Sequence, residues 1–424
     1  MNKKKESKVV PNVRFKGFTD DWKQRKLGDN IVEYTEKTTE NNQYPVLTSS
    51  RKGIFFQADY YDGNQIASAD NTGYNIVPYG YFTYRHMSDD EIFHFNINDI
   101  AENGIVSTLY PVFTTDENLD SRYLQYQLNY GREFAKYAIL QKQGGSRTYM
   151  YLNKLRNLYI TVPTTIEEQK KISECFTNLD RLITLHQQKI TLLTKLKKAM
   201  LEKMFPKKGT VIPEIRFNGF ANAWKQRKFD EVFDCTIPSN TLSRAELNYE
   251  SGSVRNIHYG DILIKYGSVV DVKNDEIPFA TGKSSEDFKS ALLQDGDIII
   301  ADTAEDETTG KACEIGNSQG LDVVSGLHTM VCRPRNKMAL GYLGYYLNSD
   351  AYHHQLLPLM QGIKVLSLSR TNVQKTMVCY PQSKAEQQLI ADCFRNLDHL
   401  ITLHQRKIDK IKNMKKAMLD QMFI

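Results

Sequence analysis

The sequence lacks the features that mark membrane, secreted and zinc-binding proteins. No apolar run approaches the roughly 18 residues that a membrane-spanning helix needs, and the basic N-terminus MNKKKESKVV has no apolar core of a secretory signal. The six cysteines are scattered and none lies within four residues of another, which excludes a CxxC redox pair and zinc-type spacing. We therefore expect an intracellular protein with reduced cysteines and no metal site.

The signatures of common enzymes are also missing. The chain has no GxxxxGK[ST] phosphate loop, no HExxH, no GxSxG, no glycine-rich nucleotide fingerprint and no Asn/Asp-Pro-Pro-aromatic motif of amino-methyltransferases. Glu305, Asp306 and Glu307 precede Lys311 in a pattern that loosely resembles a nuclease cluster, but further acidic partners at suitable spacing are absent. A solvated or DNA-discriminating loop explains that stretch better, and we expect no catalytic residue.

What the chain does have is length, ordinary soluble composition and a slight excess of positive charge. Its 424 residues allow two to four domains, with 41% apolar and 25% charged residues. The net charge of +5 is compatible with a polyanionic partner, although the placement of basic patches matters more than their sum.

The strongest signal is an internal repeat. The stretch RFKGFTDDWKQRK from Arg14 recurs as RFNGFANAWKQRK from Arg216, with nine of thirteen positions identical, and it holds both tryptophans of the chain. A second stretch, FTNLDRLITLHQQKI from Phe176, recurs as FRNLDHLITLHQRKI from Phe394 with twelve of fifteen identical. The segments between, roughly 30–162 and 233–380, show little similarity. Two copies are too few for a solenoid, so we expect an internal pseudo-dimer with a pseudo-twofold axis.

The second repeated stretch predicts two long helices. Residues 164–205 contain no Gly or Pro, Thr164 or Thr165 is a suitable N-cap, and Pro206 ends the helix. Apolar residues recur every seven positions, which is typical of a coiled coil, and two such helices of one pseudo-dimer should pack antiparallel. The predicted seam consists of Ile172, Leu179, His186, Leu193 and Met200 with Ile390, Leu397, His404, Ile411 and Met418.

The two seam histidines leave two alternatives open. His186 and His404 lie near the middle of their helices, where the symmetry would bring both close to the axis. They could bind a metal ion or respond to pH, or they could be polar seam residues that fix the register of the coiled coil.

The dissimilar segments read as α+β bodies in which short apolar runs alternate with turns rich in Gly, Asn and Asp. Their loops carry side chains of the kinds that contact base edges and phosphates, although each loop taken alone is better explained as a solvated loop. The candidate DNA-binding residues are Tyr84, Arg85, His86, Gln141, Gln143, Ser146, Arg147, Lys265, Tyr266, Ser268, Thr303, Lys311, Gln361 and Lys364.

The repeated blocks resemble those of the specificity (S) subunits of type I restriction-modification systems, the HsdS family. The resemblance rests on the doubled RF.GF....WKQRK and on PTTIEEQKKISECFTNLDRLI from Pro163 with its counterpart PQSKAEQQLIADCFRNLDHLI from Pro381. It covers the whole chain as two half-repeats. It implies target-recognition domains at 1–163 and 207–380, and conserved coiled-coil helices at 164–206 and 381–424.

The same resemblance implies a division of labour. Each recognition domain would read one half of a bipartite double-stranded DNA site, and the antiparallel helices would set the spacer between the half-sites. Two modification (methyltransferase) subunits would bind this scaffold, and restriction (translocase-nuclease) subunits would join them. S-adenosylmethionine would bind the modification subunits, and ATP and magnesium would bind the restriction subunits. This chain itself would bind no cofactor, and it would be cytoplasmic.

Two other interpretations compete. A nuclease or methyltransferase with a fused coiled coil would be active on DNA as a purified chain with S-adenosylmethionine or magnesium. A purely structural coiled-coil protein would account for the helices but not for two dissimilar globular bodies, and it would bind DNA without sequence preference or not at all.

Overall fold

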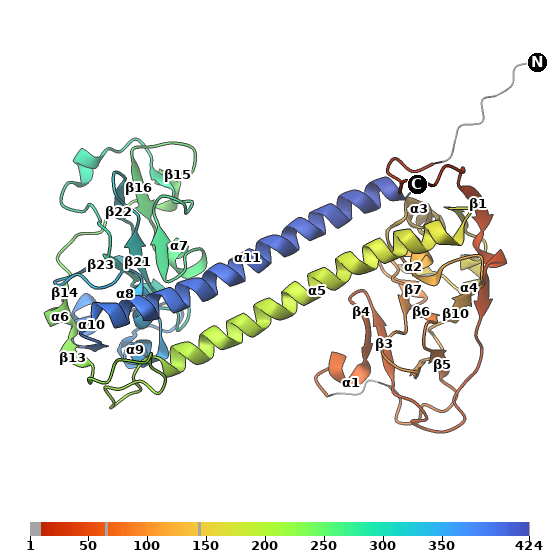
Figure 1. Ribbon diagram of the computed structural model, residues 1–424, viewed down its shortest axis with the longest axis horizontal. Coiled ribbons are helices and arrows are strands. Elements are labelled where there is room, and N and C mark those ends of the chain that lie inside the picture. The colour runs from red at the N-terminus through yellow and green to blue at the C-terminus, as the bar shows by residue number, and fades with distance from the viewer. Residues whose placement is uncertain (1–9, 64–66, 143–145, 424) are drawn as a thin grey trace, which may run out of the picture. The chain divides into compact units, whose positions relative to one another are not determined.

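The chain forms two compact units, each of which combines one globular body with parts of two long helices. The computed structural model describes residues 10–63, 67–142 and 146–423. Unit 1 comprises Met1–His186 with Arg406–Ile424, and unit 2 comprises Gln187–Gln405. The long helices are α5 (Ile166–Lys203) and α11 (Lys384–Met422) (Figure 1). This division differs from the expected boundaries between bodies and helices, because the helix ends complete the cores of the bodies.

α5 begins where the sequence predicts its N-cap, and α11 begins with a cap of the same kind. The hydroxyl of Thr165 accepts a hydrogen bond of 3.4 Å from the backbone N–H of Glu168, and Ser383 caps Glu386 at the same distance. α5 then continues to Lys203, so the absence of Gly and Pro in this stretch correctly predicted an uninterrupted helix.

In unit 1 the two helices run in opposite directions. The rings of Phe176 and Phe423 stack with centroids 5.8 Å apart, and Lys415 Nζ lies 2.6 Å from the Asp180 carboxylate. Phe176 precedes Asp180 on α5, whereas Phe423 follows Lys415 on α11. The contact is therefore antiparallel, as the sequence predicts.

Unit 2 repeats this arrangement with the helices exchanged. Phe394 of α11 stacks on Phe205, just beyond α5, at 5.8 Å, and Lys197 of α5 lies 2.5 Å from Asp398 of α11. Each of these residues lies 218 positions from its counterpart in unit 1. Of the predicted seam residues, Ile172, Leu179, Leu193, Ile390 and Leu397 are buried, whereas His186, Met200, His404, Ile411 and Met418 are half-buried.

The body of unit 1 is built from small antiparallel sheets and short helices. Its largest sheet has the order β2-β10-β6-β8, beside the pairs β1-β12, β3-β4, β5-β9 and β7-β11. The strands are β1 (Lys23–Lys26), β2 (Ile31–Glu33), β3 (Leu47–Ser50), β4 (Gly53–Phe56), β5 (Asn75–Pro78), β6 (Phe82–Thr83), β7 (Met87–Ser88), β8 (Asn96–Ile97), β9 (Asn103–Val106), β10 (Val112–Thr115), β11 (Thr148–Tyr149) and β12 (Tyr159–Val162). The helices are α1 (Gln57–Tyr60), α2 (Ser121–Tyr130), α3 (Arg132–Leu140) and α4 (Leu152–Leu155).

The body of unit 2 is larger and mixed in strand direction. Its sheets have the orders β14-β23-β19-β21-β17 and β15-β18-β16-β22, beside the pairs β13-β25 and β20-β24. The strands are β13 (Lys225–Lys228), β14 (Phe233–Asp234), β15 (Leu247–Asn248), β16 (Val254–Ile257), β17 (Val269–Asp271), β18 (Phe279–Ala280), β19 (Ile298–Ala301), β20 (Thr303–Ala304), β21 (Ala312–Gly316), β22 (Asp322–Ser325), β23 (Thr329–Pro334), β24 (Leu366–Ser367) and β25 (Met377–Tyr380). The helices are α6 (Phe229–Val232), α7 (Tyr259–Ile264), α8 (Tyr342–Leu347), α9 (Asp350–His353) and α10 (Arg370–Val373). The expectation of α+β bodies is confirmed.

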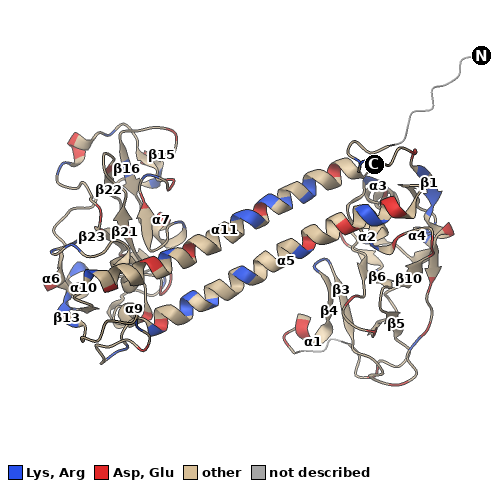
Figure 2. Cartoon of the chain, in the orientation of Figure 1, with Lys and Arg blue, Asp and Glu red and all other residues tan. Residues whose placement is uncertain are grey.

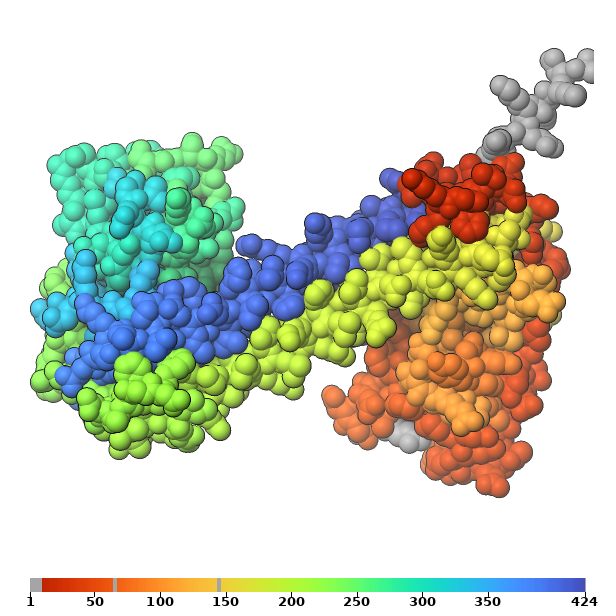
Figure 3. Space-filling view, viewed as in Figure 1, coloured from red at the N-terminus to blue at the C-terminus, as the bar shows by residue number. Residues whose placement is uncertain are grey.

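The first described residues of the chain contact the end of α11, and the end of α11 is part of the core of unit 1. Phe423, at the end of α11, packs against Tyr123 with ring centroids 5.7 Å apart, and the N–H of Val13 donates to the carbonyl of Gln421 at 3.2 Å. Figure 3 shows the red N-terminal segment lying over the blue end of α11. Burying two large aromatic rings is worth several kcal/mol, by roughly 25 cal/mol per Å², so the end of α11 is part of this core.

Two further observations bear on the expectations from sequence. No helix among the described residues is long and apolar enough to cross a membrane. The cysteines are free thiols, as expected, but the fold brings the sulfurs of Cys235 and Cys332 to 3.0 Å, a proximity that their spacing of 97 residues does not reveal.

Candidate nucleic-acid interface

The repeated RF.GF....WKQRK motif anchors each body to the first turn of a long helix. In unit 1, Arg14 donates two hydrogen bonds of 2.6 and 2.7 Å to the carboxylate of Glu168. The indole N–H of Trp22 donates to the same carboxylate at 3.4 Å. Both Trp22 and Glu168 are buried, and a carboxylate in such a place requires charge-assisted partners. The motif therefore supplies the donors that make this burial possible.

Unit 2 holds the same anchor at the same places in its repeat. Arg216 donates to Glu386 at 2.6 and 2.9 Å, and Trp224 donates to it at 3.2 Å. The tryptophan of each motif therefore anchors the entry of its body to the long helix. The KQRK segments that follow are strands, β1 paired with β12 and β13 with β25, and Figure 2 shows both as basic segments.

The glutamine after each anchoring glutamate makes a second attachment. Gln169 accepts the N–H of Asp120 at 2.8 Å and donates to the carbonyl of Pro163 at 3.1 Å. Gln387 makes equivalent bonds at 2.9 and 2.8 Å in unit 2, to the Ala339 N–H and the Pro381 carbonyl. The Glu-Gln dipeptide thus fixes both bodies in one way, although the sheets and loops of the two bodies differ.

The body of unit 1 has an open hollow of about 800 Å³ that carries both positive charge and aromatic surface. It lies between the β3–β4 hairpin, α1 and the segment around β7. Exposed cations and half-buried tyrosines line part of it: Arg51, Lys52, Arg85, Tyr60, Tyr61 and Tyr110. Arginine and lysine attract phosphates and read guanine, and tyrosine supplies a face or a hydroxyl to a nucleotide. We call this feature the unit 1 hollow.

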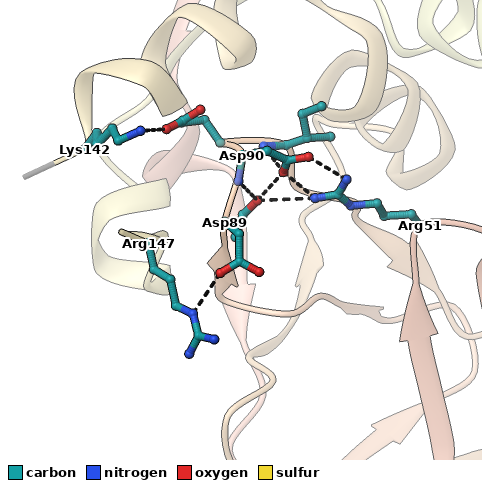
Figure 4. A network of polar contacts seen from close by, with 8 residues as sticks. Arg51, Asp89, Asp90, Lys142 and Arg147 are labelled. Carbon is teal, nitrogen blue, oxygen red and sulfur yellow. Dashed lines mark hydrogen bonds and ion pairs between the residues drawn. The ribbon is translucent and has the colours of Figure 1, made fainter. Parts of the chain in front are cut away.

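A short acidic turn after β7 holds several of the nearby cations (Figure 4). The Asp90 carboxylate accepts two bonds from Arg51, one of them 2.7 Å long. Asp89 accepts from Arg147 at 2.8 Å, and the adjacent Glu91 pairs with Lys142. The bonds from Arg51, with a further one from Ser88, hold the pKa of Asp90 well below its usual range. All of these pairs are exposed, so they position the cations without burying them.

Aromatic rings form a stack on the β7–β11 pair of unit 1. The ring of His86 lies 5.0 Å from that of Tyr151 and 6.0 Å from that of Tyr149, and the two tyrosines stack at 5.9 Å. Both tyrosines are exposed, whereas His86 is buried beneath them with its Nδ1 against the carbonyl of Leu109. The tyrosines therefore present flat faces at the surface, which a base or sugar can contact.

Unit 2 offers a different set of side chains at the corresponding place in its backbone. In unit 1 the N–H of Met150 donates to the carbonyl of His86 at 2.7 Å, and in unit 2 Leu368 donates to Asp302 at 2.8 Å. Asp302 thus occupies the position of His86. Around it lie Thr303 and His328, with the Thr303 hydroxyl donating to Asp302 at 2.8 Å.

The structure places the predicted DNA-binding residues in three groups. Arg85, Ser146, Arg147, Lys265, Gln361 and Lys364 are exposed, and Gln141, Ser268, Thr303 and Lys311 are half-buried. Tyr84, His86 and Tyr266 are buried in the cores, and the Tyr84 hydroxyl donates to the Met150 carbonyl at 2.9 Å. Gln143 lies outside the described residues.

Burial and existing bonds remove some candidates from the interface that we propose. Tyr84 and Tyr266 have almost no exposed surface. Lys311 donates to the carbonyls of Leu263 and Tyr266 at 3.0 and 3.1 Å, at the C-terminal end of α7, and burial lowers its pKa. Its ammonium group is used within the fold, so we leave these three residues out. The nearby Asp306 closes its own turn by accepting from the Thr308 N–H at 2.9 Å, which suits a solvated loop.

Several residues of these surfaces were not predicted from the sequence. Arg51 and Lys52 form the turn between β3 and β4, and the basic dipeptide followed by Gly53 was a usable sign of an exposed hairpin. Tyr60, Tyr61 and His328 had no such sign, because their proximity to the other residues depends on long-range packing.

Three comparisons place this chain among known proteins. The sequence model of the family described as "Type I restriction modification DNA specificity domain" matches residues 19–195 and 221–413. The Type I restriction enzyme MjaVIII specificity subunit of Methanocaldococcus jannaschii is 24% identical over 337 residues, which are 76% of this chain and 74% of that protein. The crystal structure of a Type-I restriction-modification system S subunit from M. genitalium aligns with a TM-score of 0.56 at 11% identity, covering 98% of this chain and 99% of that one. That structural likeness shows a shared fold.

Proposed function

Because the chain belongs to the type I restriction-modification DNA specificity family, we propose that each of its units reads one half of a bipartite DNA target. The family supplies DNA sequence specificity and is non-catalytic. In this proposal the unit 1 hollow and the surface around Asp302 in unit 2 are the two reading sites. The target is double-stranded DNA, since both surfaces present polar side chains of the kinds that contact base edges, and the unit 1 hollow adds cations that attract phosphates.

One observation carries the proposal: an identical anchor supports two unlike surfaces. The Arg14–Glu168 and Arg216–Glu386 pairs have the same geometry, with Nε–Oε1 distances of 2.6 Å in both units. The residues that precede the equivalent strands β7 and β20 nevertheless differ: the residue is His86 in unit 1 and Asp302 in unit 2. A repeated frame with unrepeated reading residues is what recognition of two different half-sites requires.

The repeat also supports binding of two identical partners, which we propose are modification (methyltransferase) subunits. Apolar side chains are exposed at repeated positions of the long helices: Leu182, Leu185 and Met414 in unit 1, and Leu400, Leu403 and Leu196 in unit 2. Each lies 218 residues from its counterpart. Exposed leucines at matched positions suit a partner that binds once per unit.

We propose the rest of the complex by resemblance to the family. The long helices would set the spacer between the half-sites, because each contributes to both units. Restriction (translocase-nuclease) subunits would join the modification subunits, which would bind S-adenosylmethionine, while the restriction subunits would use ATP and magnesium.

The test uses the chain with and without modification subunits. We expect the purified chain to bind DNA without methylating or cutting it, and the complex with modification subunits to methylate a bipartite sequence when S-adenosylmethionine is added. Methylation or cleavage by the chain alone would favour the rival interpretation of a stand-alone enzyme. A variant with Leu182 and Leu185 changed to Ser should bind one modification subunit rather than two, measured by native mass spectrometry.

A further inference from the structure

Unit 2 carries a compact polar cluster directly beside the β20–β24 pair. Asp302 immediately precedes β20, and its N–H donates to the carbonyl of His328 at 3.1 Å. The backbone N–H of Leu368, which follows β24, donates to the carbonyl of Asp302 at 2.8 Å. Asp302 therefore joins the turn at His328 to the β20–β24 pair. The His328 side chain is 48% exposed and that of Asp302 is 26% exposed, so the cluster can meet another molecule.

The imidazole of His328 meets its polar neighbours through Nδ1. Its Nδ1 lies 3.5 Å from the Asp302 carboxylate and 3.5 Å from the Thr303 hydroxyl. The ring of Tyr259 meets it edge to face, with centroids 5.3 Å apart and planes at 78°. Among the described residues, Nε2 has no hydrogen-bonding partner. The side chain is thus oriented by three neighbours while one ring nitrogen stays available.

The backbone of His328 is in an uncommon conformation. Its φ of 54° lies in the left-handed region, which costs a residue with a Cβ about 1 kcal/mol or more relative to glycine. The turn is fixed by Thr329, whose hydroxyl donates to the carbonyl of Gly326 at 2.5 Å. Glycine would suit the position better for stability alone, and retained strain of this kind is typical of functional sites.

We propose that His328 Nε2 contacts a base edge in the half-site that unit 2 reads, and that Asp302 is the positioning residue that orients the ring. This proposal rests on the proposed function and names a specificity-determining residue within it. With Nδ1 directed at the carboxylate, Nε2 accepts a hydrogen bond from the amino group of adenine or cytosine, and a protonated ring donates to guanine N7.

The cluster is suited to a base rather than to a phosphate. Asp302 places a carboxylate beside the ring, and a carboxylate repels a phosphate group while it can accept from a base amino group. The equivalent place in unit 1 has His86, Tyr149 and Tyr151 instead of this acidic group. The two units thus present different chemistry at one structural position, as different half-sites require.

The experiment uses the full chain in complex with its modification subunits. Sequencing of methylated bases in cells first defines the bipartite motif of the wild type. Binding is then measured for a panel of duplexes in which each base pair of the motif is replaced in turn. The variants are His328→Gly and His328→Asn, which suit the left-handed backbone, and Asp302→Asn. His354→Ala is the matched control, since among the described residues the His354 side chain bonds only the carbonyl of Asp350, at 2.6 Å.

We expect the wild type to discriminate at one base pair of the unit 2 half-site by about 10- to 100-fold, the range for a good base contact. His328→Gly should lose that discrimination and keep discrimination everywhere else, with a melting temperature no lower than that of the wild type, since glycine suits the left-handed backbone. Asp302→Asn should weaken discrimination at the same base pair, and His354→Ala should behave as wild type. Unchanged discrimination in both His328 variants, or an equal loss for every duplex, would overturn the assignment of His328. A wild type without a bipartite motif would instead refute the proposed function.

Discussion

The Arg14 guanidinium donates two hydrogen bonds, of 2.6 and 2.7 Å, to the carboxylate of Glu168, which lies 154 residues further along the chain. The pair fastens the entry of the first body to the first turn of α5. Arg216 and Glu386 do the same for the second body. The duplicated motif is therefore a structural joint, and its tryptophan is part of that joint.

Breaking one joint should destabilise the unit that contains it. Glu168→Gln leaves Arg14 without its counter-charge and the Trp22 N–H with a weaker acceptor. Removing one partner of a buried pair costs about 3 kcal/mol, and we expect that loss in the free energy of unfolding measured by urea denaturation. Glu231→Gln is the control, because its pair with Arg227 is exposed and should contribute little. Equal stabilities of the two variants would contradict the structural role of the joint.

The acidic turn of unit 1 should restrain non-specific DNA binding. The Asp90 carboxylate accepts hydrogen bonds from the Arg51 guanidinium, which would otherwise be available to bind phosphate. Asp90→Asn should therefore tighten binding to duplexes that lack the target by about threefold to tenfold, with a steeper dependence on salt. Asp99→Asn removes the same charge from a pair with Arg122 that lies away from the hollow. An equal effect of Asp99→Asn would show that net charge alone matters.

Glu314 should make the stability of unit 2 depend on pH. Burial raises the pKa of this carboxyl to about 7, although it accepts the N–H of Gly344 at 2.9 Å. Between the ordinary pKa of 4.5 and pH 7 the folded state holds the proton more tightly than the unfolded state, so stability falls as the pH rises. Thermal unfolding at pH 5.5 and 8.5 measures this fall, which Glu314→Gln should largely remove. Glu305 is exposed, so Glu305→Gln should keep the pH dependence of thermal stability that the wild type shows. If Glu314→Gln also kept this pH dependence, its assignment to Glu314 would be contradicted.

Lengthening both long helices should lengthen the spacer of the target. One extra heptad in α5 and one in α11 adds about 10.5 Å of helix, which corresponds to about 3 base pairs at about 3.4 Å each. Sequencing of methylated motifs should show the same half-sites with a longer gap. A heptad added to α5 alone breaks the pairing of α5 with α11 and should instead abolish methylation. An unchanged gap in the double insertion would contradict the role of the helices in spacing.

The repeat made much of this fold predictable, and the unrepeated segments did not. Identical residues at a fixed separation predicted the helices and their antiparallel contact, because heptad spacing is local and its duplication restricts the partner. The Glu168–Arg14 joint was not predicted, since a charge pair 154 residues apart leaves no local pattern. In the bodies, Tyr84 and Lys311 looked like loop residues by type, but each lies next to a strand, and long-range packing turns it inward.

The most direct test of the account is the methylated motif of cells in which residues 30–162 are replaced by the corresponding body of another family member. Arg14, Trp22 and Glu168 remain, so the joint that holds the body is preserved. We predict that one half of the motif changes to that of the donor, while the other half keeps its sequence. A motif in which both halves change, or in which neither does, would contradict the claim that each unit reads its own half-site.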